Sequence, residues 1–131
     1  MVRLSMEVVG LAARTVLRKL SMAYLTFRDL LVWQQSMLLV REVYALSATL
    51  PLDERFGLSA QLKRAVVSIP SNIAEGARRR RPLTFKYHLE VALGSQAEID
   101  VQLEIAKDLG FIDEAAHRGV LRRLVQAPAR P

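Results

Sequence analysis

The spacing of apolar residues along this chain predicts a protein built from helices. Between residues 30 and 48, apolar side chains recur at steps of three and four, which places them on one face of a helix. Similar spacing covers 58–76 and 82–109, and a shorter pattern covers 113–126. We therefore expect an all-α fold, an antiparallel up-and-down four-helix bundle formed by residues 22–126.

Two of the expected helices carry the heptad-like seam that is typical of helix bundles. In the first helix the predicted seam is Leu30, Trp33, Met37, Val40, Tyr44 and Ser47. In the helix over 82–109 it is Phe85, Leu89, Ala92, Gln96, Ile99, Leu103 and Ala106. Pro82 suits a first helical turn, Gly110 a C-terminal cap and Asp113 an N-terminal cap, so these residues set the predicted helix ends.

The second helix of the bundle contains a proline. Pro70 removes one backbone hydrogen bond and crowds the carbonyl of Val66, one turn earlier. Helical spacing continues beyond the proline nevertheless. The pattern therefore predicts one Pro-kinked helix rather than two separate helices.

Polar residues around the proline are interpreted as structural. We expect Ser68 and Asn72 to bond the backbone groups that the kink frees. Glu75 is expected to bond the open backbone, or to pair with Lys63, Arg64 or an arginine of a neighbouring chain. A glycine then ends the helical pattern. The predicted structural set of the kink is Ser68, Pro70, Asn72, Glu75 and Gly76.

The stretch from Ser68 to Gly76 reads Ser-Ile-Pro-Ser-Asn-Ile-Ala-Glu-Gly. It resembles the signature of the family called four helix bundle protein, or 23S rRNA intervening-sequence protein. The resemblance runs from about Phe27 to Phe111 and includes Phe27–Leu30, Trp33, Val43–Tyr44, Pro51, Glu54–Leu58, Gln61–Arg64, Ala92–Ser95 and Glu98. It implies an all-α bundle that assembles into a ring-like homopentamer, and it leaves the biochemical role open.

The two ends of the chain lie outside the expected bundle. Residues 1–21 show no convincing apolar stripe, so we expect a weakly ordered or loosely helical N-terminal extension. Met22 is a candidate start of translation, because the region that resembles the family begins shortly after it, at about Phe27. Residues 127–131, which contain two prolines, are expected to form a frayed tail.

Charge is distributed unevenly along the 131 residues, whose net charge is +6. Residues 55–90 contain eight basic and two acidic residues, whereas residues 91–116 contain one basic and six acidic residues. This asymmetry favours either a surface that binds polyanions or protomers that meet through opposite charges.

The best candidate for function is the run Arg78–Arg81 between two predicted helices. Four guanidinium groups in one turn suit phosphate oxygens. A solvated loop that merely separates the helices is an equally weighted alternative. No aromatic residue is interleaved with the run, so base stacking is not indicated. The predicted nucleic-acid-binding residues are Arg64, Arg78, Arg79, Arg80, Arg81 and Lys86.

Enzyme chemistry finds little support in the sequence. The chain has no cysteine, and its only histidines are His88 and His117. Glu114 and His117 match the Glu-x-x-His motif of di-iron bundles, but such a site needs two of these motifs and two further carboxylates. We therefore expect no catalytic residues, no metal and no cofactor.

These observations predict a non-enzymatic, cytoplasmic homo-oligomer that associates with nucleic acid, with RNA or DNA bound at the arginine run. No apolar run is long enough for a membrane span. The alternative is a protein–protein adaptor ring that binds a partner such as a polymerase or reverse transcriptase.

Overall fold

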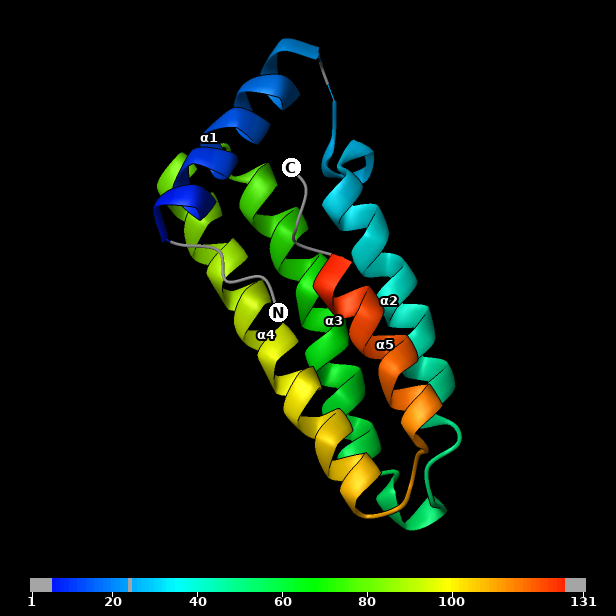
Figure 1. The fold of residues 1–131 in the computed structure, drawn as a ribbon. Helices are drawn as coiled ribbons and strands as arrows, with labels where there is room; N and C mark the ends of the chain where they lie inside the picture. The colour runs from blue at the N-terminus through cyan, green and yellow to red at the C-terminus, as the bar shows by residue number, and fades with distance from the viewer. Residues whose placement is uncertain (1–5, 24, 127–131) are drawn as a thin grey trace.

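The structure, a computed structural model, describes residues 6–23 and 25–126. Over these residues it contains helices and no strand, which confirms the predicted all-α class. Figure 1 shows α2 to α5 side by side as a bundle, with α1 at one end of it. The elements are α1 (Met6–Ala23), η1 (Phe27–Asp29), α2 (Leu31–Ser47), η2 (Leu52–Glu54), α3 (Leu58–Arg78), α4 (Pro82–Asp108) and α5 (Glu114–Gln126).

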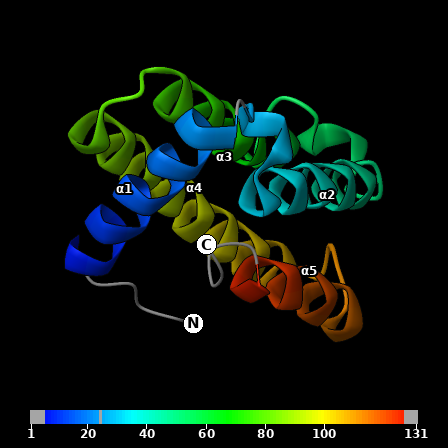
Figure 2. The same ribbon diagram turned by 90° about the horizontal axis from the view of Figure 1, so that it is seen from above.

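The main hydrophobic core lies between α2, α3, α4 and α5, and the view along the bundle in Figure 2 shows these helices around it. The largest fully buried side chains of this core are Leu39, Val43, Leu62, Val66, Ile73, Ile99 and Leu103. None of the helices, as far as the structure describes them, has a stretch long and apolar enough to cross a membrane. The strictly antiparallel order of the bundle helices stays a prediction.

The buried face of α2 differs from the predicted seam. Ser36, Leu39, Val43 and Ser47 are buried, whereas the predicted seam residues Met37 and Tyr44 are 37% and 43% exposed. Apolar residues surround most of this helix, so their spacing alone did not decide which face points inward. Helix α3 contacts this face at Ser47, whose carbonyl accepts a hydrogen bond from the hydroxyl of Ser59 at 3.4 Å.

The predicted seam of α4 is largely confirmed. Phe85, Ala92, Ile99, Leu103 and Ala106 are all buried.

The predicted ends of α4 and α5 are confirmed as well. Gly110 has a φ of 76°, and its N–H donates to the carbonyl of Lys107, while the N–H of Phe111 donates to that of Ala106. These two bonds form a Schellman motif. The N–H of Ala116 donates to the carboxylate of Asp113 at 2.8 Å, so Asp113 caps α5.

Helix α3 continues through Pro70 as one helix, as the spacing predicted, and the kink itself stays a prediction. Gly76 does not end this helix, which continues to Arg78. A Cβ atom at Gly76 would lie 2.8 Å from both the Cβ of His88 and the Cδ2 of Phe85. The glycine therefore allows α3 and α4 to pack closely, and the expectation that it stops the helix is wrong.

Residues 6–23 form the helix α1, so the N-terminal extension, expected to be weakly ordered or loosely helical, is helical over the residues that the structure describes. An apolar stripe is present after all, because Val9, Ala13, Leu17 and Leu20 are buried. Three of them join Ala77 and Phe85 in a second core, separate from the main one. The predicted frayed tail over 127–131 lies outside the described residues.

Candidate nucleic-acid interface

The arginine run forms the tight turn between α3 and α4. Arg78 is the last residue of α3, Arg79 is its C-cap, and Arg81 is the extended N-cap of α4. Arg80 lies in the left-handed region, with a φ of 57°. An L-residue in this conformation costs about 1–2 kcal/mol, so neighbouring contacts must hold the turn.

Two of the four arginines have partners within the chain. Arg79 forms an ion pair with Glu75 at 3.2 Å. Glu75 was expected to contact open backbone, Lys63 or Arg64, and it contacts Arg79 instead. Arg80 donates to the hydroxyl of Ser21 at 3.3 Å and to the carbonyl of Leu25 at 3.4 Å. Arg80 therefore fastens the turn to the C-terminal end of α1 and is a structural residue.

The other two arginines are available to a ligand. Arg78 and Arg81 are exposed, and neither makes an ion pair or side-chain hydrogen bond with any residue that the structure describes. They flank Arg79 and Arg80, so two unpaired guanidinium groups lie at one end of the bundle.

The structure does not bring Arg64 to this turn. Arg64 lies fourteen residues before Arg78 in α3, which places it about 21 Å away along the helix axis. Lys86 lies one turn into α4, where it is half-buried and 4.0 Å from Glu90. Of the six predicted residues, Arg78 and Arg81 are thus the two that lie at this turn without a side-chain partner among the described residues.

Two of the predicted kink residues, Ser68 and Asn72, take part in a polar network between α3 and α4. The Nδ2 of Asn72 donates to the carbonyl and the hydroxyl of Ser68, at 2.8 and 3.0 Å, and its Oδ1 lies 2.9 Å from the Nδ1 of His88. Ser95 donates to the hydroxyl of Ser68. Pro70 has no N–H, so the carbonyl of Val66 lacks its helical donor. Asn72 does not replace this donor, because its side chain bonds the carbonyl of Ser68 instead.

Much of this network comes from the stretch Ser68–Gly76, which resembles a family signature. A comparison with protein-family models finds that the 23S rRNA-intervening sequence protein family matches residues 28–128, from η1 through α5. The chain belongs to this family. A comparison with curated proteins finds no match.

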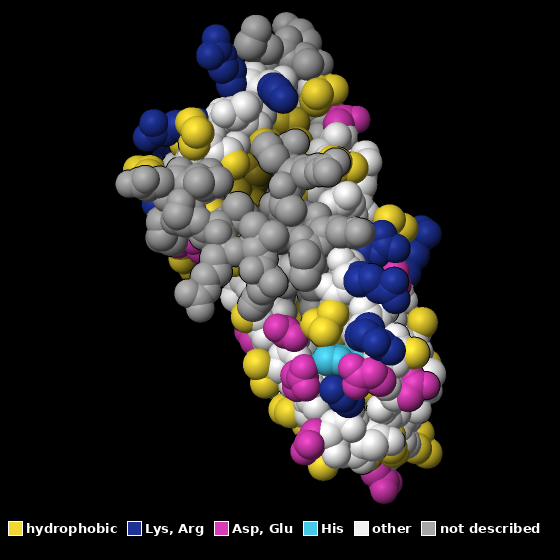
Figure 3. Space-filling view, viewed as in Figure 1, with side chains coloured by type: hydrophobic (Ala, Val, Ile, Leu, Met, Phe, Trp, Pro, Cys, Tyr) yellow, Lys and Arg dark blue, Asp and Glu magenta, His cyan; other side chains and the backbone are white. Residues whose placement is uncertain are grey.

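Helix α1 precedes the residues that match the family, and it adds basic side chains that the sequence analysis missed. Arg14, Arg18 and Lys19 are exposed on α1, and Arg18 and Lys19 shortly precede Ser21, the partner of Arg80. Figure 3 shows basic side chains on the surface near α1. The signal in the sequence was the spacing of Arg14 and Arg18, four residues apart and opposite the apolar stripe.

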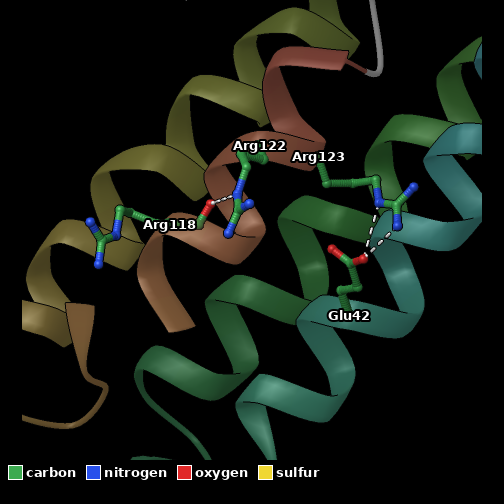
Figure 4. Close-up of polar contacts among 4 residues, drawn as sticks. All are labelled: Glu42, Arg118, Arg122 and Arg123. Atoms are coloured by element: carbon green, nitrogen blue, oxygen red, sulfur yellow. Dashed lines mark hydrogen bonds and ion pairs between the residues drawn. The ribbon is translucent and has the colours of Figure 1, made fainter. Parts of the chain in front are cut away.

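A second basic group lies on α5, within the part that matches the family. Arg123 donates through Nε and Nη2 to the Oε1 of Glu42 on α2, at 3.0 and 2.8 Å, and thereby fastens α5 to the bundle (Figure 4). Arg122 donates to the backbone carbonyl of Arg118 and makes no ion pair with a residue that the structure describes, and both arginines are exposed. Arg118 and Arg122 are therefore a natural comparison for the arginines of the α3–α4 turn.

Proposed function

We propose that this family member is a non-enzymatic, self-associating bundle protein of the cytoplasm that binds RNA through the α3–α4 turn. The observation that carries the proposal is the pair of exposed, unpaired arginines, Arg78 and Arg81, beside the basic face of α1. The family's name refers to 23S rRNA, which makes RNA the first polyanion to test and DNA the second. The absence of cysteine from the chain fits a reducing compartment.

The physical basis of such binding is electrostatic. Arginine forks donate two parallel hydrogen bonds to phosphate oxygens, and each neutralised phosphate releases condensed counterions. In an oligomer, every protomer would present the same turn, so weak contacts would add up by avidity. Binding should accordingly be insensitive to sequence and strongly dependent on salt.

The double substitution Arg78→Gln with Arg81→Gln should weaken RNA binding and flatten its salt dependence. For a single-stranded RNA, the slope of log K against log salt should fall by about 0.7 for each phosphate that the protein no longer neutralises, or about 1.4 for two phosphates per protomer. Fluorescence anisotropy over a salt series measures this slope. Arg80 is left intact because it holds α1 against the turn.

The matched control is the double substitution Arg118→Gln with Arg122→Gln, which removes the same charge from exposed positions on α5. We expect this control to keep the wild-type slope. If the wild type and the turn variant showed equal slopes of log K against log salt, the α3–α4 turn would not be the polyanion site.

Self-association is proposed from apolar side chains that the monomer leaves uncovered. Several lie on α2 and α4, and exposed patches of this kind usually mark interfaces. They are Leu31, Met37, Leu38 and Tyr44 on α2, and Val101, Ile105 and Leu109 on α4 and its cap.

Light scattering at micromolar protein should therefore give a mass several times the 14.7 kDa of one chain, with five protomers expected from the family resemblance. The substitution Leu38→Glu should lower this mass, because it places a charge on the exposed face of α2. A wild-type protein that stays monomeric at this concentration would contradict the proposal.

The same exposed apolar residues favour a second candidate function, an adaptor that binds a protein such as a polymerase or reverse transcriptase. An apolar interface with a partner is insensitive to nuclease, whereas an RNA-mediated one is not. Retention of a protein partner after nuclease treatment, together with weak RNA binding by the purified protein, would favour the adaptor.

A further inference from the structure

Three metal-ligating side chains meet where α5 packs on α4. Asp100 and Glu104 lie four residues apart on α4, so both carboxylates lie on one side of the helix. His117 comes from the first turns of α5, just after the Asp113 cap. One oxygen of each carboxylate and one ring nitrogen of His117 all lie within 4.8 Å of one another. Figure 3 shows acidic side chains gathered around histidine atoms over this part of the bundle.

His117 supplies an independent indication of a ligand. Only 3% of the residue is exposed, and neither buried ring nitrogen makes a hydrogen bond. A buried nitrogen without a hydrogen bond costs about 1–3 kcal/mol, so a native site normally provides a partner. Among the described residues the Nδ1 has none, and the Nε2 has only the Oε1 of Glu104, at 3.2 Å.

The spacing of two of these atoms fits shared coordination. The Nε2 of His117 lies 3.2 Å from the Oε1 of Glu104, but the pair lacks the angles of a hydrogen bond. Two ligands that each lie about 2.1 Å from one metal ion, at angles between octahedral and tetrahedral, are separated by about 3.0–3.4 Å. The two atoms are therefore placed as neighbouring ligands of a common ion would be.

We propose that Asp100, Glu104 and His117 form a binding site for a divalent transition-metal ion, with Zn²⁺ as the first choice. An imidazole with two carboxylates suits Zn²⁺, Mn²⁺ or Fe²⁺, whereas Ca²⁺ and Mg²⁺ prefer oxygen ligands alone. Three protein ligands leave at least one position for water or for a ligand from outside. The bound ion links α5, the shortest of the five α-helices, to the longest, α4.

Glu114, the carboxylate that the sequence pairs with His117 in a Glu-x-x-His motif, is not part of this site. It forms an ion pair with Lys107 at 2.8 Å. The hydrogen bond from Lys107 lowers the pKa of Glu114, and the same bond and the negative charge of Glu114 raise the pKa of Lys107. The site thus departs from the expectation of no metal, because its carboxylates come from another helix.

The test is a titration of the tag-free, chelator-treated protein with Zn²⁺ by calorimetry, and with Co²⁺ by visible absorption. We expect saturable binding of one ion per chain, with a Zn²⁺ affinity that falls about tenfold or more in His117→Gln and in Glu104→Gln. Zn²⁺ should also raise the Tm of the wild type and leave the Tm of these variants unchanged. The Co²⁺ spectrum reports the coordination geometry.

Two control substitutions keep the test sharp. Glu114→Gln removes a neighbouring carboxylate and His88→Gln removes the other histidine, and both should bind Zn²⁺ like the wild type. Because the Glu104 side chain is 58% exposed, Glu104→Gln is not expected to disturb folding even where His117→Gln does. The proposal is overturned by a wild type without saturable binding, or by a Glu104→Gln variant with wild-type affinity.

Discussion

Replacing Phe85 with alanine is expected to lower the free energy of unfolding by about 3–5 kcal/mol, the usual cost of emptying a fully buried aromatic site. The ring is 1% exposed, and it joins α1 to the bundle through its cluster with Leu17, Leu20 and Ala77. Removing it leaves a cavity at the end of the molecule where α1 docks. Urea unfolding followed by circular dichroism, at one fixed protein concentration, measures the loss.

Leu83→Ala is the control, since it also truncates an apolar side chain to alanine, two residues earlier on α4. Leu83 is 76% exposed, so the expected change is within about 0.5 kcal/mol. Similar losses in the two variants would show that Phe85 does not fill a core.

Replacing Gly76 with alanine is expected to destabilise the protein by about 1–3 kcal/mol, as overpacking of a core does. The added methyl would lie 2.8 Å from the Cβ of His88 and from the buried ring of Phe85. Neither of these is the free end of a flexible side chain, so α3 and α4 would have to separate. The same unfolding measurement detects the effect.

Gly94 provides the opposite case on the neighbouring helix. A Cβ atom there meets nothing within 4 Å, so Gly94→Ala should stabilise α4 by about 0.5–1 kcal/mol. The two glycine variants should thus move the urea midpoint in opposite directions. A Gly76→Ala variant as stable as the wild type would mean that the glycine is not needed for close packing of α3 and α4.

The predictions from the sequence were most accurate for features whose residue pattern has a single structural interpretation. In α4, five residues of the predicted seam are buried, and Gly110 and Asp113 cap helix ends through hydrogen bonds to nearby backbone. These features were all found, because local geometry decides them.

Elsewhere, contacts between distant residues decided the outcome. In α2, Leu31, Met37 and Leu38 are as apolar as the buried Leu39, so the sequence could not identify the inner face. From the sequence, Gly76 could either end a helix or allow another helix to pack closely against it. Only the position of Phe85 in the structure distinguishes these two functions.

The candidate sites show the same limit. The sequence located the arginine run but could not show that Ser21, some sixty residues earlier, binds Arg80. Likewise, the cluster of Asp100, Glu104 and His117 depends on the register between α4 and α5, which no spacing within one helix specifies.

The position of Arg80 has a thermodynamic consequence. Its guanidinium binds the end of α1, and the inner face of the same helix covers Phe85 and Ala77. A local opening of α1 would therefore uncover an apolar surface and free a third arginine in a single step. Any ligand that prefers the opened state shifts this equilibrium by its differential affinity. If the proposed RNA ligand bound all three arginines and a protein partner bound the uncovered apolar surface, both would prefer the opened state, and each would favour the binding of the other.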